Sequence, residues 1–237
     1  MAVDTRTRSN EPELMDDFAL EGEILRDALD KIASINKLLG GNKVTLDGVK
    51  SLIGSINKDR EISILDVGCG NGDMLRTLAE YGQANQIKFK LIGVDANAFT
   101  IRHAENLSGQ YDNISYQCID IFTDAFKTIN FDIILCTLTL HHFKDEEILN
   151  LMQSFQQQTS LGIVINDLHR SKLAYHLFNA ICFVFRLNEM SRKDGLVSIL
   201  RGFKRADLEQ YSRELKFKNY SIRWRWAFRY QWIIKSI

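Results

Sequence analysis

The chain has 237 residues, of which 45% are hydrophobic and 25% charged; this composition is typical of one folded domain with a buried core and excludes a disordered chain. Its 30 basic and 30 acidic side chains balance, but residues 201–237 have a surplus of Lys and Arg over Asp and Glu. That surplus fits nucleic acid, anionic lipid or merely a solvated face on an edge hairpin, so charge alone names no partner.

Two patterns predict a cytoplasmic protein. Residues 1–17 are polar and lack the apolar stretch that a secretory signal requires. The four cysteines are widely spaced, with no CxxC pair and no histidine nearby at metal-ligand spacing. We therefore expect buried, reduced thiols at Cys69, Cys118, Cys136 and Cys182.

Residues 1–60 predict a helical extension that covers part of the domain formed by residues 61–237. Apolar side chains recur at helical spacing from about Leu20 to Leu39, where Gly40 and Gly41 end the pattern. A second short helix is expected to follow, with Thr45 as its N-cap.

Short apolar runs then alternate with helical stretches. The runs are residues 62–67, 89–94, 114–118, 131–136 and 161–165. This alternation indicates β/α units around a parallel sheet.

The last third of the chain has two further apolar segments. Residues 173–187 are strongly apolar but too short for a membrane span, which needs about 20 residues, so we expect a buried helix. In "YSIRWRWAFRYQWII", aromatic residues alternate with arginines, which predicts an antiparallel hairpin with one apolar face buried on the sheet.

The stretch "ILDVGCGNGD", residues 64–73, places three glycines at alternate positions after the first predicted strand. Glycines allow the chain to turn and to present backbone N–H groups to a ligand at a helix N-terminus. The spacing differs from the GxGxxG loop that binds a pyrophosphate. Asp66 and Asp73 bracket the loop and would repel a pyrophosphate, whereas one of them could pair with an ammonium group. The loop therefore predicts a cationic or zwitterionic ligand.

This stretch resembles the first motif of class I S-adenosylmethionine-dependent methyltransferases. Three more segments follow in that family's order: "LIGVDAN", "YQCIDIF" and "FDIILCTLTLHHF". The resemblance covers about residues 62–167 and, in outline, the final hairpin. It implies a Rossmann-like, doubly wound, seven-stranded α/β sheet, mostly parallel with an antiparallel C-terminal hairpin. It also implies a helical substrate lid at about residues 170–205 and S-adenosylmethionine as the cofactor.

The resemblance also implies a set of cofactor-binding residues. Asp95, at the end of the second strand, would accept hydrogen bonds from both ribose hydroxyls. Asp120 would bind the adenine amino group with Ile121 beside the ring, unless Asp120 only caps a helix. The other expected members are Asp66, Gly68, Cys69, Gly70, Asn71, Gly72, Ala96, Cys136 and Thr137.

Methyl transfer needs an aligned nucleophile, and a base when that nucleophile is a phenol. His141 is the first candidate for the base and His142 the second, with His169 also open; Asp167 could orient the base or the substrate. Alternatively, the histidine pair only packs or caps a helix, and Asp167 only caps a helix, without a role in catalysis. A metal site formed by His141, His142 and Asp167 is not expected, because adjacent histidines on a short turn should point in different directions.

The apolar residues 171–203 lie where this family builds its substrate lid, which predicts a lipophilic or aromatic acceptor. The runs "NDLHR" and "DGLVSILRGF" resemble bacterial ubiquinone/menaquinone-type methyltransferases that act on phenols, quinones or polyketides. Arg201, and less so Arg186, could reach an anionic acceptor group.

The predicted function is O-methylation of such a small molecule. We expect no nucleic-acid partner and at most peripheral membrane contact; a homodimer is left open. Two alternatives remain: an RNA or protein methyltransferase that uses the basic hairpin, and a non-catalytic partner subunit that only binds the cofactor.

Overall fold

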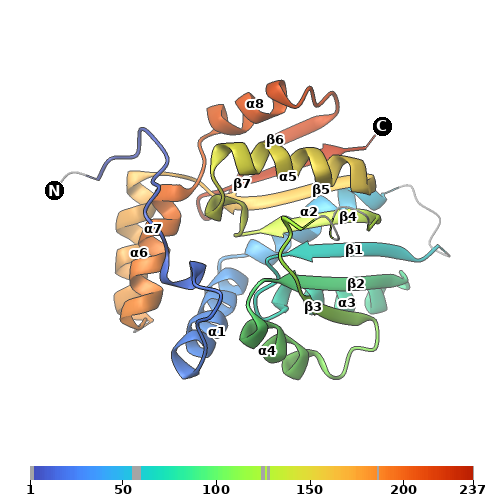
Figure 1. Cartoon of the computed structure of the whole chain (residues 1–237), viewed down its shortest axis with the longest axis horizontal. Helices are drawn as coiled ribbons and strands as arrows, with labels where there is room; N and C mark the ends of the chain where they lie inside the picture. The colour runs from blue at the N-terminus through green and yellow to red at the C-terminus, as the bar shows by residue number, and fades with distance from the viewer. Residues whose placement is uncertain (1–2, 55–59, 124–125, 127–128, 186, 237) are drawn as a thin grey trace.

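An open sheet lies at the centre of the structure, and helices cover its two faces (Figure 1). The computed structural model describes residues 3–54, 60–123, 126, 129–185 and 187–236. Within them the strand order is β3-β2-β1-β4-β5-β7-β6. The strands are β1 (Ile62–Val67), β2 (Phe89–Asp95), β3 (Ile114–Cys118), β4 (Phe131–Thr137), β5 (Thr159–Leu168), β6 (Tyr220–Arg225) and β7 (Arg229–Lys235).

The strands β1 to β5 are parallel, and β7 and β6 add an antiparallel pair at one edge. The predicted doubly wound, mostly parallel sheet with a C-terminal hairpin is therefore confirmed. Its register aligns the carboxyl ends of the central strands, since Val67 lies opposite both Val94 and Cys136. In open α/β sheets a ligand lies outside these ends, so the loops after β1, β2 and β4 form one rim.

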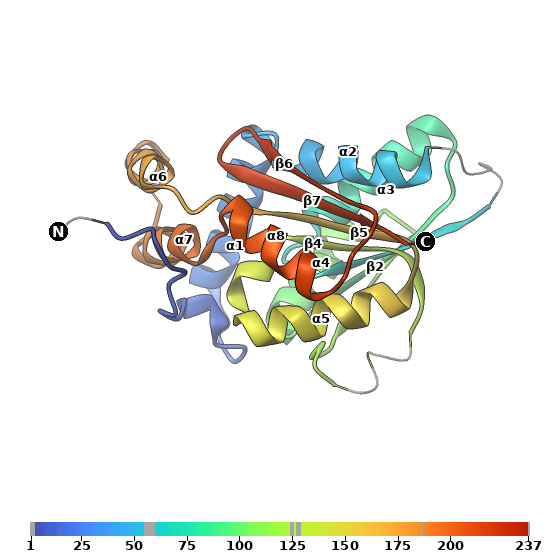
Figure 2. The same cartoon turned by 90° about the horizontal axis from the view of Figure 1, so that it is seen from above.

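Helices cover both faces of the sheet (Figures 1 and 2). They are α1 (Glu23–Leu38), α2 (Gly41–Ile53), α3 (Asp73–Asn85), α4 (Ala98–Ser108), α5 (Asp145–Gln158), α6 (Lys172–Val184), α7 (Glu189–Arg201) and α8 (Arg205–Glu214), with short 3-10 helices η1 (Leu14–Asp16) and η3 (Leu140–His142). Of these, α1, α6 and α7 lie beyond one end of the strands. Figure 2 shows α2 and α3 on one face of the sheet, and α5 and α8 on the other. Each face has its own apolar core: Val49 and Leu75 belong to the first, Phe155 and Trp232 to the second.

The N-terminal segment, residues 3–22, runs along α7 at the carboxyl end of the sheet (Figure 1). The backbone N–H of Ser9 donates to the carbonyl of Leu200 (3.0 Å). Farther on, the carboxylate of Asp194 accepts from the N–H groups of Leu14 and Met15 at 2.8 and 3.0 Å. The predicted extension is therefore not uniform. Helix α2 packs into the apolar core on one face of the sheet, whereas the N-terminal segment lies at the carboxyl ends of the strands.

The prediction that Thr45 caps the second helix is wrong. Helix α2 begins at Gly41, directly after Gly40, whose φ of 75° lets α1 turn into α2 without a loop. Thr45 lies inside α2 and is buried; its hydroxyl contacts that of Thr137 at 3.0 Å and accepts from the Asn166 amide at 3.0 Å. A threonine that joins a helix to the sheet has the same local sequence pattern as a cap.

Helix α6 is not the buried helix that its apolar sequence predicts. Only Ala174 and Cys182 are buried within it, and Phe183 and Val184 are 88% and 72% exposed. The helix lies beside α7, away from the sheet core (Figures 1 and 2). Within the described residues, no helix is long and apolar enough to cross a membrane.

The hairpin buries only part of the aromatic face that its alternation predicts. Trp232 is fully buried, but Trp224 and Trp226 are 48% and 69% exposed. Trp224 lies on β6, which is the edge strand, and Trp226 lies in the turn. Strand β7 is covered on both faces, so that even Gln231 is buried, where it donates to the carbonyl of Val44 at 2.6 Å.

The four cysteines are free, as expected, but Cys118 is exposed, contrary to the prediction that each thiol is buried. Cys118 is the last residue of β3, the edge strand at the other end of the sheet, where fewer neighbours cover the side chain.

Candidate functional site

The glycine loop between β1 and α3 has a backbone that other residues adopt with strain. Gly68 and Gly72 have φ values of 66° and 78°. A Cβ atom at Gly68 would collide with the side chain of Thr139, and one at Gly72 would collide with the hydroxyl of Tyr116. The N–H of Gly68 donates to the carbonyl of Val94 at 2.9 Å. The loop is thereby fixed between the ends of β1, β2 and β4.

A first cavity of about 540 Å³ opens beside this loop, within the size range of small-molecule sites. Among the predicted cofactor residues, its lining includes Gly68, Asp95, Ala96, Asp120 and Ile121. The structure does not place Asp66, Cys69, Gly70, Asn71, Gly72, Cys136 or Thr137 in that lining. The cavity therefore brings together the residues assigned to the ribose and the adenine, with one member of the glycine loop.

After β4, the residues that line the first cavity lie one or two positions farther along the chain than the predicted Cys136 and Thr137. Cys136 is fully buried in the sheet core, and the hydroxyl of Thr137 contacts that of Thr45. The next residues, Leu138 and Thr139, line the first cavity instead. Leu138 has a φ of 55°, a left-handed turn that is uncommon for leucine and carries the chain off the strand.

Two carboxylates lie at the strand ends near the loop. Asp95 accepts from the N–H of Asn97 at 3.0 Å and from that of Gly70 at 3.3 Å, and burial raises its pKa. Asp66 lies beneath the loop, where burial and the neighbouring carboxylates of Asp95 and Asp73 raise its pKa to about 8. Its Oδ1 atom has no hydrogen-bond partner among the described residues, which leaves it ready to accept one.

Asp120 stabilises a turn and does not cap a helix within the described residues. Its carboxylate accepts from the N–H of Phe122 at 2.9 Å, and its carbonyl accepts from the hydroxyl of Thr123 at 2.8 Å, so the residue stabilises a turn after β3. The residue also lines the first cavity, next to Ile121.

The predicted pair of His141 and Asp167 is in contact and buried. The ring Nδ1 of His141 lies 2.7 Å from Oδ1 of Asp167, and the backbone N–H of His141 donates to Oδ2 at 3.1 Å. Burial would raise the pKa of Asp167, but the charge and hydrogen bond of His141 lower it below its ordinary value. A carboxylate at Nδ1 fixes the orientation of the ring. The other ring nitrogen, Nε2, then faces Glu13.

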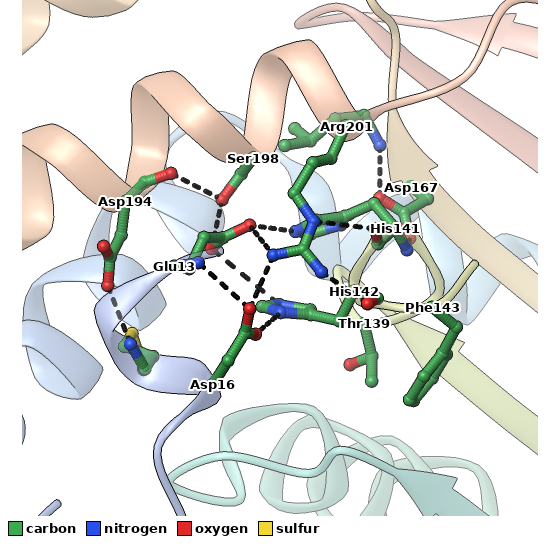
Figure 3. A network of polar contacts seen from close by, with 12 residues as sticks. Glu13, Asp16, Thr139, His141, His142, Phe143, Asp167, Asp194, Ser198 and Arg201 are labelled. Atoms are coloured by element: carbon green, nitrogen blue, oxygen red, sulfur yellow. Dashed lines mark hydrogen bonds and ion pairs between the residues drawn. The ribbon is translucent and has the colours of Figure 1, made fainter. Parts of the chain in front are cut away.

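The two adjacent histidines do not point in different directions, contrary to the prediction. Their ring centroids are 4.3 Å apart with the planes at 31°. Nδ1 of His142 lies 2.6 Å from a carboxylate oxygen of Asp16. Both Nε2 atoms face Glu13: that of His141 lies 3.6 Å from Oε1, and that of His142 lies 3.9 Å from Oε2 (Figure 3).

Glu13 and Asp16 come from the N-terminal segment and were absent from the predicted site. Glu13 is buried, and Ser198 donates its hydroxyl to Oε2 at 2.7 Å. Burial raises the pKa of Glu13 to about 7, despite the lowering effects of His142, Ser198 and Arg201. Among the described residues, neither Glu13 Oε1 nor His141 Nε2 has a hydrogen-bond partner. In the sequence, "EPELMDD" gave no signal beyond its acidity, since the contact spans more than 120 residues.

Arg201 is occupied by the site itself rather than open to an anionic acceptor. Its Nη1 lies 2.7 Å from Asp16 Oδ2, and Nε donates to the carbonyl of His141 at 3.2 Å. A further hydrogen bond reaches the carbonyl of His142. Arg186, the second predicted arginine, lies outside the described residues.

A second cavity of about 440 Å³ lies on the other side of the histidines, and its walls are mostly apolar. The walls come from α1, α6, α7 and the hairpin turn, and include Phe178, Ile181, Ile199 and Trp226. His169 also lines it, with Nδ1 3.3 Å from the indole nitrogen of Trp224. Four residues line both cavities: Met15, Leu138, His141 and His142. The histidines therefore lie at the boundary between a first cavity lined by Asp95 and Asp120 and a second, mostly apolar cavity.

Comparisons with known proteins agree with this architecture. Residues 64–162 match the family described as a methyltransferase domain. A ubiquinone biosynthesis O-methyltransferase of Coxiella burnetii is 38% identical over 85 residues, which are 35% of this chain and 34% of the relative. A protein-lysine N-methyltransferase of Saccharomyces cerevisiae is 32% identical over 98 residues, or 40% and 41% of the two chains. This chain thus spans about a third of the length of the first of these relatives.

Among solved structures, a plantazolicin methyltransferase in complex with S-adenosylhomocysteine shares the fold. Its TM-score is 0.64 at 17% identity, over 90% of this chain and 94% of that one. The matched region, 64–162, contains the glycine loop, Asp95, Asp120 and the histidine pair. Residues 64–162 therefore match a methyltransferase domain, and the chain has the fold of this S-adenosylhomocysteine-bound methyltransferase.

Proposed function

We propose that this protein transfers the methyl group of S-adenosylmethionine to a hydroxyl oxygen of a lipophilic, aromatic small molecule. The observation that carries the proposal is the shared boundary of the two cavities at His141 and His142. The first cavity is lined by five of the predicted cofactor residues, among them Asp95 and Asp120, and the second is apolar enough for an aromatic acceptor. The name of the Coxiella burnetii relative, a ubiquinone biosynthesis O-methyltransferase, supports the same acceptor class.

The residues of the first cavity suit an adenosyl ligand. Asp95 would hold the ribose hydroxyls, and Asp120 and Ile121 the adenine. Asp66 lies outside the lining of this cavity, and its carboxylate, once ionised, would pair with the ammonium group. When bound, S-adenosylmethionine supplies a methyl group on a sulfonium centre. The acceptor oxygen would form a bond to that carbon as the sulfur–carbon bond breaks, and the hydroxyl proton would pass to Nε2 of His141. Asp167 would orient that ring and stabilise its charged form.

A search for transfer to defined acceptors tests the proposal. The purified protein would be incubated with S-adenosylmethionine and lipophilic phenols, together with their O-methylated counterparts as matched controls. We expect S-adenosylhomocysteine and a methyl ether to form from the free phenols only. Binding of the cofactor without transfer to any hydroxyl compound would favour the non-catalytic alternative.

The observation that favours an RNA methyltransferase is the exposure of Trp224 and Trp226 on the basic hairpin. Trp226 lines the second cavity, so we assign it to the acceptor path, and Trp224 contacts His169 through its indole nitrogen. These contacts favour a role of both residues beside the acceptor cavity over a stacking platform of the kind that binds single-stranded RNA. Salt-dependent retention of the protein on RNA, lost on Trp224→Ala, would contradict this assignment.

Cofactor binding should release a proton from Asp66. In the ligand-free protein its pKa is raised to about 8 by burial and by its acidic neighbours, so the carboxyl is mostly protonated at pH 7. An ammonium group bound beside it favours the charged form. We therefore expect about one proton to be released per S-adenosylhomocysteine bound at pH 7, with affinity rising as the pH rises towards 8.

Calorimetric titrations in buffers of different ionisation enthalpy measure this release. Asp66→Asn should bind S-adenosylhomocysteine more weakly and without the release. A wild-type titration that releases no proton would contradict the pairing of Asp66 with the ammonium group.

Narrowing the second cavity should weaken binding of long acceptors. Ala180 lines this cavity on α6, so Ala180→Trp would place an indole ring into the acceptor path. We expect KM for a phenol with a long alkyl chain to rise by about tenfold or more, equivalent to about 1.4 kcal/mol, with little change for phenol itself. The matched control is Asn179→Trp, at an exposed neighbouring position outside the lining. Equal effects of the two variants would contradict the proposed acceptor cavity.

A further inference from the structure

We propose that Glu13, His141 and His142 bind a divalent transition-metal ion such as Zn²⁺ at the boundary of the two cavities. One carboxylate oxygen of Glu13 and one ring nitrogen from each histidine lie within 4.8 Å of one another. Figure 3 shows the three side chains converging from two distant parts of the chain, the N-terminal segment and η3. The sequence predicts no metal site from His141, His142 and Asp167; in the structure Glu13, not Asp167, supplies the carboxylate near both Nε2 atoms.

The distances suit a small ion. Zinc binds nitrogen and oxygen ligands at about 2.0–2.1 Å, which places tetrahedral ligands about 3.3 Å from each other. Here the Nε2 atoms of His141 and His142 lie 3.6 and 3.9 Å from the oxygens of Glu13. These are two different oxygens of the carboxylate, and one ligand atom from each residue lies within 4.8 Å of the others, so the three side chains would move closer together around an ion.

The contacts at Nδ1 of the two histidines are of the kind that metal-binding histidines make. Metal-binding histidines commonly donate their second ring N–H to a carboxylate, which fixes the tautomer and the ring orientation. Both histidines do so: Asp167 lies 2.7 Å from Nδ1 of His141, and Asp16 lies 2.6 Å from Nδ1 of His142. Each Nε2 lone pair is thereby directed towards Glu13.

The inner atoms of the site are also left without partners. His141 and Glu13 are both buried, with 3% and 6% of their surface exposed, yet Nε2 of His141 and Oε1 of Glu13 make no hydrogen bond within the described residues. Buried polar atoms are nearly always paired. An ion between these two atoms would satisfy both at once.

Two nearby guanidinium groups oppose a cation: Nη2 of Arg8 donates to the carbonyl of His141 at 3.1 Å, and Nη1 of Arg201 lies 3.5 Å from Oε1 of Glu13. The guanidinium of Arg201 is already held by Asp16 and by the carbonyls of His141 and His142. With Glu13, Asp16 and Asp167, three acidic groups lie around the histidines against the two guanidinium groups. The local charge therefore favours a divalent cation over a vacant cluster.

Three protein ligands with a free coordination position are typical of catalytic zinc sites. The free position here would face the cavities that His141 and His142 both line. An acceptor hydroxyl bound there would lose its proton to water more readily, because a metal ion lowers the pKa of an oxygen bound to it. This last step rests on the proposed function; with an ion bound, His141 acts as a ligand instead of receiving the proton.

The test is titration of the metal-free, full-length protein with Co²⁺, whose visible absorption reports tetrahedral coordination, followed by competition with Zn²⁺. We expect one equivalent to bind. His142→Ala and Glu13→Gln should weaken binding by about 100-fold or more. The matched control is His176→Ala, which removes an exposed histidine of α6 outside both cavities and should bind as the wild type does.

Thermal unfolding of each variant shows whether it is folded. The site is overturned if the wild type takes up no stoichiometric ion, or if folded His142→Ala and Glu13→Gln bind it equally well. Ion binding without methylation of any phenol would leave the site intact and count against the proposed function. Methylation of a phenol by a protein that binds no ion would support the proposed function and contradict the metal site.

Discussion

Replacing His141 with alanine should lower kcat by about 10²–10⁴-fold, the usual contribution of a positioned acid or base. The ring is buried, oriented by Asp167 at 2.7 Å, and lines both cavities. Whether it receives the proton or holds an ion that activates the hydroxyl, its removal leaves the acceptor oxygen protonated. Cofactor affinity should change little, because the residues assigned to the adenosine lie elsewhere in the first cavity.

Single-turnover kinetics with a phenolic acceptor, together with titration by S-adenosylhomocysteine, measure the two quantities separately. His169→Ala is the control within the second cavity, since His169 lines that cavity but not the boundary. We expect it to affect KM more than kcat. A His141→Ala variant that turns over at the wild-type rate would move the chemistry to another residue.

The second large effect is expected at Asp95. Asp95→Ala should weaken S-adenosylhomocysteine binding by about 10–150-fold, because hydrogen bonds to a charged group contribute about 1.5–3 kcal/mol. Part of the loss will come from the glycine loop, since Gly70 donates its N–H to the same carboxylate at 3.3 Å.

Asp95→Asn separates the two causes, because the amide keeps an oxygen for the loop but loses the charge. Calorimetric titration of both variants, with Glu105→Ala on the exposed side of α4 as the control, gives the affinities. Unchanged binding in Asp95→Ala would contradict the assignment of this residue to the ribose.

The parts of the fold that could be predicted are those encoded by local patterns. The apolar runs of β1 to β5 are short and bounded, and the glycine loop demands its residues because Gly68 and Gly72 lie at positive φ against other side chains. Asp95 could be located because it ends a strand whose register with β1 is fixed. Local sequence and global topology agree at these positions.

The rest depends on contacts between distant segments. Glu13 and Asp16 reach the histidines because Asp194, Ser198 and Arg201 hold the N-terminal segment against α7. The exposure of α6 follows from its place beside α7, and a strongly apolar helix gives no sign of that in its own residues. The left-handed turn at Leu138, which shifts the cavity lining by one or two residues from Cys136, is likewise set by packing.

The most direct test of the proposed function is one methyl-transfer experiment read out by NMR. The protein would be given S-adenosylmethionine labelled with ¹³C in its methyl group, and a set of acceptors with one alkyl-aromatic skeleton that carries a phenol, an amine or a carboxylic acid. We expect a labelled methyl ether from the phenol, formed faster than any other product and in smaller amount with His141→Ala. Preferential label on nitrogen or carbon, or equal transfer by His141→Ala, would contradict the proposed function.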